Sequence, residues 1–231
     1  RSVSTIASPS ARLTASVAAQ HALDAVLAAG SALVLPTHAE VAIVGAGLAG
    51  ITLAASFRDA GAELVAVLEK SSTVGGTWRH HGNAYSRVNS SEPAYRLRVE
   101  RSRPNTNHSH HSQILADVLH MVEQHRLSQS IFTHAEVTGV SSIDSGWLLA
   151  GLRHTARPFA LPCDFAVLCT NRRLGRPRSI QFPGEDTFGG DVRRGLSGDT
   201  NSLNCAGDRV VVLGMGAFAV ENMRTSFELG A

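Results

Sequence analysis

Residues 41–50 read VAIVGAGLAG, and this stretch decides the fold. Its first four residues form a short apolar run, which is typical of a buried parallel strand. Glycines stand at 45, 47 and 50, and residues 51–60 then carry a helical pattern that Gly61 ends. Residues 63–69 (ELVAVLE) predict a second strand. The sequence therefore contains a complete strand–helix–strand unit of an α/β protein.

The glycine spacing in this turn indicates a dinucleotide site. Gly45 permits the tight turn, Gly47 lets the backbone approach a diphosphate, and Gly50 lets the helix pack closely on the sheet. The start of the helix offers free N–H groups and the positive end of its dipole to the phosphates. Glu69 ends the second strand, where an acid binds ribose hydroxyls and disfavours a 2′-phosphate. The site is predicted to take FAD or NAD rather than NADP. A packing turn in an unrelated α/β protein is the alternative.

A second pair of glycines narrows the choice of cofactor. Gly75 and Gly76 precede Thr77 and Trp78, soon after the ribose acid. Two glycines let a loop lie against a large cofactor. Binding of FAD requires such a loop, whereas binding of NAD does not. An ordinary Gly-Gly loop is the alternative interpretation.

A second glycine cluster near the end of the chain repeats the first pattern. Gly214, Gly216 and Ala219 follow a predicted strand at 209–213 and open a predicted helix at 219–229. Alanine in the third position still allows close helix–strand contact. The cluster predicts a second nucleotide, a nicotinamide cofactor, with a redundant α/β turn as the alternative. The residues that distinguish NADH from NADPH would follow the next strand, beyond Ala231.

The rest of the chain predicts a small antiparallel meander and one more helix. The helix covers residues 112–126, with Ser112 as a possible cap. The strands of the meander, with a buried strand after them, are predicted at 131–140, 146–152, 157–161 and 164–170.

The predicted domain organisation divides the chain into four parts. These are an N-terminal extension at 1–37, a first nucleotide-binding domain at 38–170, a linker at 171–208 and the start of a second nucleotide-binding domain at 209–231. A loose apolar stripe predicts a helix within 1–37, and the alternative is the tail of a targeting peptide. The first residue is Arg1 rather than Met, and the chain stops just after an apparent helix, so we expect a piece of a longer protein.

Composition excludes several classes of protein. The chain has 231 residues, 43% hydrophobic and 17% charged, with a formal net charge of +2, which argues against a disordered tail and a nucleic-acid-binding face. Its three cysteines, Cys163, Cys169 and Cys205, form no Cys-x-x-Cys pair, so we expect a reducing compartment and a cytoplasmic protein. The uncharged stretch 41–57 is too short for a membrane-spanning helix.

Three nearby histidines are the only clustered candidates for metal ligands. His108, His110 and His111 lie in a polar segment, but no further set of Cys, His or acidic residues completes a site. We therefore predict a solvated loop and no metal.

Beyond these motifs, residues 38–231 resemble the flavin-containing monooxygenases and their Baeyer–Villiger relatives. The resemblance rests on the order and spacing of the motifs above, together with 85–90 (YSRVNS), 168–170 (LCT), 182–184 (FPG), 188–190 (FGG) and the second glycine cluster. It implies a Rossmann-like FAD-binding domain, FAD and NADPH as cofactors, and O₂ as co-substrate. In that family a flavin hydroperoxide inserts one oxygen atom into an amine, a sulfide or a ketone. The oligomeric state is not readable.

The resemblance also implies roles for single residues. Glu69 and Lys70 would lie at the FAD ribose, and Gly76, Thr77 and Trp78 along the FAD. Asn89 matches the flavin-side asparagine of the family and is the candidate catalytic residue. The remaining candidates for cofactor binding are Val137, whose backbone would contact adenine, and Thr170 at the strand end. Two positions depart from the family pattern: Arg194 replaces a histidine and Asn171 replaces a glycine.

Two other functions remain open. FAD-dependent disulfide reductases share the layout but place a redox cysteine after Gly-Gly-Thr, whereas this chain has Trp78 there and Asn83 at the place of the second cysteine. The other alternative is an inactive or truncated module that binds the nucleotides without oxygenating a substrate.

Overall fold

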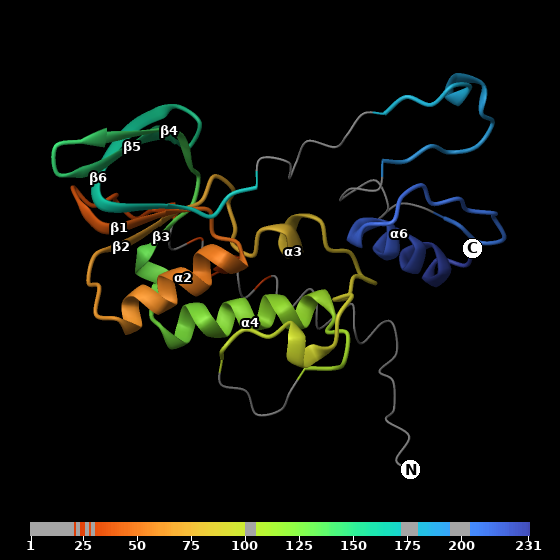
Figure 1. Ribbon diagram of the computed structural model, residues 1–231, viewed down its shortest axis with the longest axis horizontal. Helices are drawn as coiled ribbons and strands as arrows, with labels where there is room; N and C mark the ends of the chain where they lie inside the picture. Colours follow the sequence, from red (N-terminus) through yellow and green to blue (C-terminus); the bar gives the residue numbers. More distant parts are fainter. Residues whose placement is uncertain are drawn as a thin grey trace, which may run out of the picture.

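A six-stranded mixed sheet carries the first part of the chain, with strand order β3-β2-β1-β6-β5-β4 (Figure 1). The computed structural model describes residues 21, 24, 25, 28, 31–99, 105–171, 180–194 and 204–231. Its strands are β1 (Ala39–Val44), β2 (Val65–Leu68), β3 (Ile131–Phe132), β4 (Ala135–Ile143), β5 (Gly146–Arg153) and β6 (Arg157–Leu168). Strand β1 pairs in parallel with β2 and β6, and β2 pairs in parallel with β3. Strands β4, β5 and β6 form an antiparallel meander.

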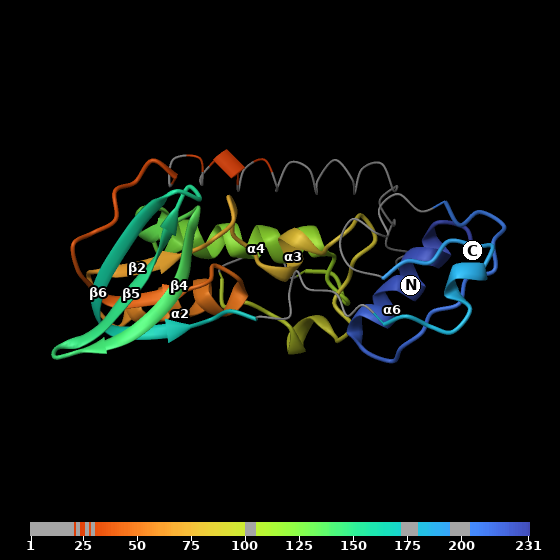
Figure 2. The same cartoon turned by 90° about the horizontal axis from the view of Figure 1, so that it is seen from above.

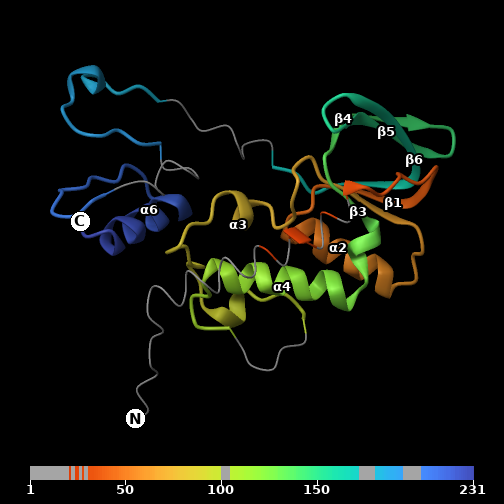
Figure 3. The same ribbon diagram turned by 180° about the vertical axis from the view of Figure 1, so that it is seen from behind.

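The helices and short 3₁₀ turns include the three helices predicted at 51–60, 112–126 and 219–229, together with short elements that were not predicted. They are α2 (Leu48–Asp59), α3 (Thr77–His80), η1 (Glu92–Ala94), α4 (His111–Gln124), η2 (Leu127–Ser130), η3 (Glu185–Thr187) and α6 (Ala217–Glu228). Helices α2 and α4 cover one face of the parallel strands, and α3 lies alongside α4, between α2 and α6 (Figures 1 and 3). Figure 2 shows the meander at the opposite end of the molecule from α6.

The core has two layers, one on each face of the parallel strands. One cluster joins β1 and β2 to α2 and α4, and fully buried members include Ile43, Ile51, Val67 and Leu115. The other cluster joins the opposite face of these strands to the meander, with Leu149 and Leu161 fully buried. Burial of both faces explains why β1 and β2 read as continuous apolar runs rather than alternating ones.

Strand β6 takes part in both halves of the sheet. Residues Arg157–Cys163 pair with β5, and Cys163–Leu168 pair with β1. The sequence predicted two separate strands here, at 157–161 and 164–170, and this division is wrong. One long twisted strand carries the sheet from antiparallel to parallel pairing without a turn.

The predicted strand at 131–140 is in fact two strands with different partners. Ile131 and Phe132 extend the parallel sheet beside β2, and β4 begins at Ala135. His134 separates them with a left-handed backbone, φ +53°, which turns the chain between the two strands.

Helix α4 begins one residue before the predicted start, and its cap is not Ser112. His110 is the N-cap: its side chain accepts the Ser112 backbone N–H, and its own N–H donates to Gln113 Oε1 at 2.9 Å. This is a capping box with histidine in the position that serine usually takes.

The predicted strand at 209–213 does not form. These residues carry no regular structure, and Val211 and Leu213 are largely exposed. A buried parallel strand needs neighbours on its edges, and the described part of the chain offers none at this place. Helix α6 does form, from Ala217, two residues before its predicted start.

The N-terminal extension lies against the sheet in its described part. Residues 21, 24, 25, 28 and 31 are helical, and Leu33 and Leu35 pack against the meander-side core. Arg153 donates hydrogen bonds to the carbonyl oxygens of Ser31 and Leu33. Much of the apolar stripe predicted within 1–37 lies outside the described residues.

Within the described residues, none of the helices has both the length and the apolar character needed to cross a bilayer.

Candidate nucleotide-binding site

The two glycine turns and Glu69 meet at the carboxyl ends of β1 and β2. The first turn connects β1 to α2, and Glu69 directly follows β2. Because β1 and β2 are parallel neighbours, the residues that follow them lie at the same edge of the sheet. This edge is where ligands bind in open α/β sheets.

Steric constraints explain the first and third glycines of the turn. Gly45 has φ +103°, and a Cβ there would stand 2.8 Å from the carbonyl oxygen of Cys169 at the end of β6. At Gly50 a Cβ would stand only 1.9 Å from the Gly45 carbonyl oxygen. A side chain at position 45 would push the turn away from the end of β6, and one at position 50 would push α2 away from the turn.

The second glycine turn lies directly against the first. The N–H of Gly75 donates to the carbonyl of Ala46 at 2.9 Å. A Cβ on Gly76, which has φ +53°, would stand 2.9 Å from the Cα of Gly47. The two turns therefore meet as bare backbone, and glycine at both positions allows that approach.

The carboxylate of Glu69 points at the first glycine turn. Its Oε2 accepts the Ala46 N–H at 2.8 Å, and its Oε1 accepts the backbone N–H and the hydroxyl of Ser71 at 2.8 and 2.9 Å. The residue is buried. A carboxylate has about four acceptor sites, so it can still accept hydrogen bonds from ligand hydroxyls.

The first turn of α2 is free to face an anion. Its N-cap is Gly47, which provides no side-chain hydrogen bond, and the first helical turn contains no acidic residue. The N–H groups at the start of a helix have no intrahelical partner, and they favour negative charge.

Other predicted residues lie around this edge in different roles. Trp78 packs against the core and donates its indole N–H to the Tyr95 hydroxyl at 2.8 Å, so it anchors the loop. Lys70 is exposed. Thr170 lies beside the first glycine turn, since a Cβ on Gly45 would stand 3.4 Å from the Thr170 Cγ2. Val137 lies at a register shift in β4, opposite Gly151.

The candidate catalytic residue, Asn89, lies at the junction with α6. Its Nδ2 donates to the carbonyl of Ala217, the first residue of that helix, at 3.3 Å. The side chain is exposed. Asn89 therefore connects the segment after the Gly75–Gly76 loop with the second glycine cluster.

Three more contacts fix α6 on the same segment. Asn83 Nδ2 donates to Thr225 Oγ1 at 3.1 Å, the Arg87 N–H donates to Glu221 at 3.4 Å, and the rings of His81 and Phe218 meet edge to face. None of these residues stands out in the sequence, because their partners lie more than 130 positions away.

The second glycine cluster has the helix but not the strand of the predicted motif. Gly214 has φ +139°, and a Cβ on it would lie 3.5 Å from the Cβ of Ala219, in ordinary contact. Gly216 is the N-cap of α6, with no side-chain cap and no acid in the first turn. The cluster therefore offers a helix start like that of α2, without the sheet edge.

The histidine segment is the predicted solvated loop only in its first part: His108 is exposed, whereas His110 and His111 are buried at the start of α4. His111 is buried, its Nδ1 donates to the carbonyl of Asn83, and its ring stacks on that of His110. Burial, helped by the nearby His110, lowers the pKa of His111 to about 3. His110 Nε2 donates to the Ala84 carbonyl at 2.8 Å. Among the described residues no group of three or more His, Cys, Asp and Glu is placed to hold a metal ion.

The replacement of the family histidine by Arg194 has a local structural consequence. Arg194 forms an ion pair with Glu185. Hydrogen bonds from the Phe182 N–H and from Arg194 lower the pKa of Glu185. The arginine therefore closes the 182–194 loop on itself. Phe188 stays exposed.

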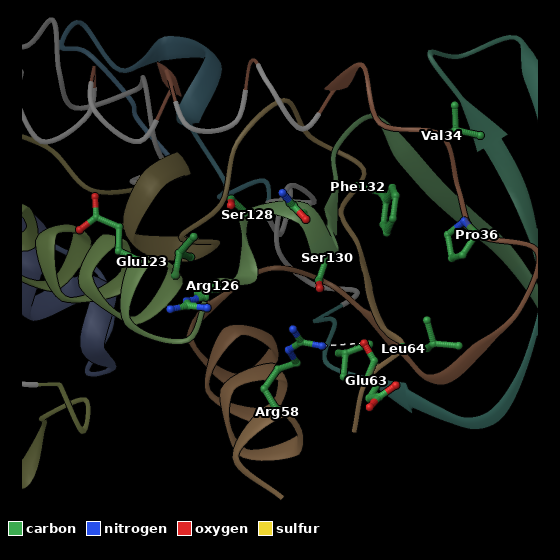
Figure 4. A pocket seen from close by; sticks show the side chains of 13 residues that line it. Val34, Pro36, Arg58, Glu63, Leu64, Glu123, Arg126, Ser128, Ser130 and Phe132 are labelled. Carbon is green, nitrogen blue, oxygen red and sulfur yellow. Dashed lines mark hydrogen bonds between the residues drawn. The ribbon is translucent and has the colours of Figure 1, made fainter. Parts of the chain in front are cut away.

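A surface groove lies away from this edge (Figure 4). It measures about 960 Å³ and is lined by Leu64 and Ser130, which directly precede β2 and β3. Arg58 at the end of α2 and Arg126 after α4 also line it. Because β1 to β3 are parallel, their starting ends face away from the glycine turns, so the groove is not part of the candidate site.

This arrangement defines a dinucleotide-binding α/β protein: a parallel strand, a glycine turn, a bare helix start, and an acid at the end of the next strand. Residues 39–231 match the sequence profile of the pyridine nucleotide-disulphide oxidoreductase family. The chain belongs to that family.

The curated relatives of the chain are monooxygenases. It is 29% identical over 190 residues to a Baeyer-Villiger monooxygenase of Streptomyces coelicolor, covering 80% of this chain and 35% of the relative. It is 26% identical over 195 residues to the FAD-binding monooxygenase VdtE of Byssochlamys spectabilis, covering 81% and 34%. The chain thus spans about a third of the length of these relatives. The resemblance to flavin monooxygenases is confirmed.

The fold is also found among solved structures. An oxidized steroid monooxygenase bound to NADP superposes with a TM-score of 0.60 and 23% identity, covering 84% of this chain and 37% of that one. This likeness confirms the Rossmann-like fold of the first domain. The four-part division of the chain and the start of a second nucleotide-binding domain stay predictions.

Proposed function

We propose that this chain is part of a monooxygenase that uses FAD and NADPH to insert one oxygen atom of O₂ into an amine, a sulfide or a ketone. The observation that carries the proposal is the Glu69 carboxylate, held 2.8 Å from the N–H of Ala46 in the first glycine turn. The monooxygenase relatives, one of them FAD-binding and one bound to NADP, support the choice of reaction and cofactors.

The residues at the sheet edge fit an FAD. The turns at Gly47 and Gly76 present backbone without side chains, which is what close approach of a diphosphate requires. The start of α2 supplies unpaired N–H groups and no competing acid. Glu69 supplies buried acceptors for ribose hydroxyls. The N–H groups at the start of α2 therefore match the diphosphate of FAD, and the acceptors of Glu69 match the hydroxyls of its adenosine ribose.

In this proposal the chain's own residues bind and orient the cofactor. Gly45, Gly47 and Gly50 form the diphosphate turn, and Glu69 and Lys70 hold the adenosine ribose. Gly75, Gly76, Thr77 and Trp78 border the cofactor further along, while the Val137 backbone and Thr170 complete the edge. When bound, the flavin supplies the redox and oxygen-transfer chemistry stated above for the family.

NADPH is assigned to the second glycine cluster. The start of α6 at Gly216 offers unpaired N–H groups to a diphosphate, as α2 does. Asn89 lies at the start of α6, with its amide on the Ala217 carbonyl. In that position it can orient groups that pass between the two cofactors, and its proposed role is to keep cofactor oxidation coupled to oxygenation.

Dithiol chemistry is not supported, although disulfide reductases give the family its name. All three cysteines are free, and Trp78 and Asn83 occupy the places of the redox pair. Burial raises the pKa of Cys163 and of Cys169, so both stay as thiols near neutral pH. The remaining alternative is a nucleotide-binding module without oxygenase activity.

The test is cofactor identification followed by turnover. The purified protein is examined by absorbance and mass for FAD, and then assayed for NADPH oxidation with a sulfide, a tertiary amine and a cyclic ketone under ¹⁸O₂. Stoichiometric FAD with one labelled oxygen atom in a product supports the proposal. Bound FAD without labelled product supports the binding module, and no FAD binding contradicts both.

A further inference from the structure

A connected path of polar contacts runs from the first glycine turn to the N-terminal extension. Glu69 accepts the Ala46 N–H at its start, and Ser71 donates to the same carboxylate. The Ser71 hydroxyl also lies 2.7 Å from the Thr73 carbonyl oxygen. At its end the Thr73 hydroxyl lies 3.4 Å from Asp24 Oδ1 and also 3.4 Å from the Val74 carbonyl oxygen, so its one hydrogen is shared between these two acceptors. Asp24 is 49 positions away in the sequence.

Asp24 also forms an ion pair with the helix that follows the Gly75–Gly76 loop. Both of its carboxylate oxygens accept from Arg79 Nη2, at 3.2 and 3.0 Å. The Arg79 N–H in turn donates to the Gly76 carbonyl at 3.1 Å. Asp24 therefore holds the 71–79 loop at two points, Thr73 and Arg79, on either side of its two glycines.

The backbone of this loop needs such support. Gly75 and Gly76 both have positive φ and no side chain that could pack, and glycine loses more conformational freedom on ordering than other residues. A Cβ on Gly75 would stand 2.7 Å from Leu115 and 3.2 Å from the Cβ of Arg79, so the loop has little free space on that side. A contact that fixes Thr73 and Arg79 fixes the glycines between them.

We infer that Asp24 is a positioning residue for the flavin site: it holds the 71–79 loop in the conformation that receives the diphosphate, so the part of the N-terminal extension that carries Asp24 contributes to cofactor binding. This inference rests on the proposed function, since it assigns FAD as the occupant of the loop. Asp24 itself acts through Thr73 and Arg79 and does not contact the cofactor. The extension thereby has a role that neither a passive helix nor a targeting peptide has.

The chain provides a specific probe for the loop. Lys70 is its only lysine and is exposed, next to Ser71. A lysine-specific endoprotease therefore cuts the protein at one place, and its rate reports opening of the 71–79 loop without any cofactor.

The experiment compares Asp24→Asn, Asp24→Glu and Asp59→Asn with the purified parent protein. Asp59 is the control, because its carboxylate also makes a side-chain hydrogen bond, at 2.8 Å to His125 Nδ1, but at the far end of α2. We measure FAD affinity by flavin fluorescence, cleavage after Lys70 in the apo protein, and Tm. Asp24→Asn should weaken FAD binding by about threefold to tenfold and speed apo cleavage by a similar factor. Asp24→Glu should restore most of the FAD affinity and most of the resistance to cleavage. Asp59→Asn should change neither the FAD affinity nor the cleavage rate.

Each other outcome has a defined meaning. If Asp24→Asn leaves FAD affinity and cleavage at the parent values, the inference is overturned. If Asp24→Asn lowers Tm but leaves the FAD affinity and the cleavage rate unchanged, Asp24 has a structural role alone, and the inference is again overturned. If the parent protein binds no FAD, the proposed function fails on that result, while cleavage after Lys70 still decides whether Asp24 orders the loop.

Discussion

Glu69 Oε2 lies 2.8 Å from the backbone nitrogen of Ala46, so the acid that ends β2 caps the glycine turn that ends β1. The side chain of Glu69 thus connects two motifs of the sequence, the glycine turn and the acid at the end of the next strand, across 23 positions. The contact pre-orders the turn and keeps the carboxylate beside the place where a nucleotide ribose would lie. Both stability and cofactor binding should therefore depend on Glu69.

Replacement of Glu69 by alanine should remove flavin. Charge-assisted hydrogen bonds to ribose contribute about 1.5–3 kcal/mol each, so FAD affinity should fall by roughly tenfold or more. The Ala46 N–H also loses its partner, and the free energy of unfolding of the apo protein should fall by about 1–3 kcal/mol. Flavin absorbance after gel filtration and urea denaturation measure the two effects. Glu69→Gln, which keeps one acceptor, should lie between; unchanged flavin content in Glu69→Ala would reject the assignment.

Gly50→Ala tests the packing of α2 on the glycine turn. Its Cβ would stand 1.9 Å from the Gly45 carbonyl oxygen, so helix and turn must separate. We expect a loss of about 3 kcal/mol in the free energy of unfolding, or failure to fold. Gly139→Ala is the matched control, because a Cβ there meets nothing within 4 Å. If Gly50→Ala and Gly139→Ala are equally stable, the backbone around Gly50 can move to accommodate the methyl group at little cost, and the expected loss of stability is wrong.

Asn89→Ala tests the contact between the segment that carries Asn89 and the start of α6. The variant loses the hydrogen bond to Ala217 and should keep FAD, because Asn89 lies outside the diphosphate turn. NADPH oxidation should continue, while the amount of oxygenated product per NADPH should fall at least about twofold, with hydrogen peroxide accounting for the difference. Quantifying NADPH, peroxide and product in one reaction measures this coupling. Full coupling in the variant would remove Asn89 from the proposed mechanism.

His111 should make the fold sensitive to acid. Its pKa lies at about 3 because the ring is buried, against about 6.5 in the unfolded chain, so the unfolded state binds the proton more tightly. Stability from this residue is therefore complete above pH 6.5 and is lost as pH falls, by about 1.4 kcal/mol per pH unit. Urea denaturation at pH 6.5 and pH 5 should show a smaller difference for His111→Asn than for the parent. The exposed His120, replaced by asparagine, should leave the difference unchanged.

The first strand–helix–strand unit could be predicted because its signals are local. Buried parallel strands read as apolar runs, and the positions of Gly45 and Gly50 follow from steric demands within a few residues. Glu69 could be assigned from its place at the end of the second strand, where an acid binds ribose hydroxyls. The identity of the cap at α4 was wrong, since His110 takes a role that serine usually has.

Contacts that join distant segments left no signal in the sequence. The ion pair of Asp24 with Arg79 and the bond of Asn83 to Thr225 depend on how loops meet in space. The strand predicted at 209–213 failed for a related reason. Its apolar residues match a buried strand, but a strand also needs hydrogen-bonding neighbours, which the sequence of the segment itself does not specify.

The central claim is that the edge formed by Gly47, Gly76 and Glu69 binds FAD. The most direct measurement is titration of the purified protein with FAD, followed by absorbance and isothermal calorimetry, with Glu69→Ala as the comparison. The account predicts one FAD per chain and a shifted flavin spectrum, with affinity reduced roughly tenfold or more in the variant. A protein that stays colourless at saturating FAD, or a variant that binds FAD as tightly as the parent, would contradict it.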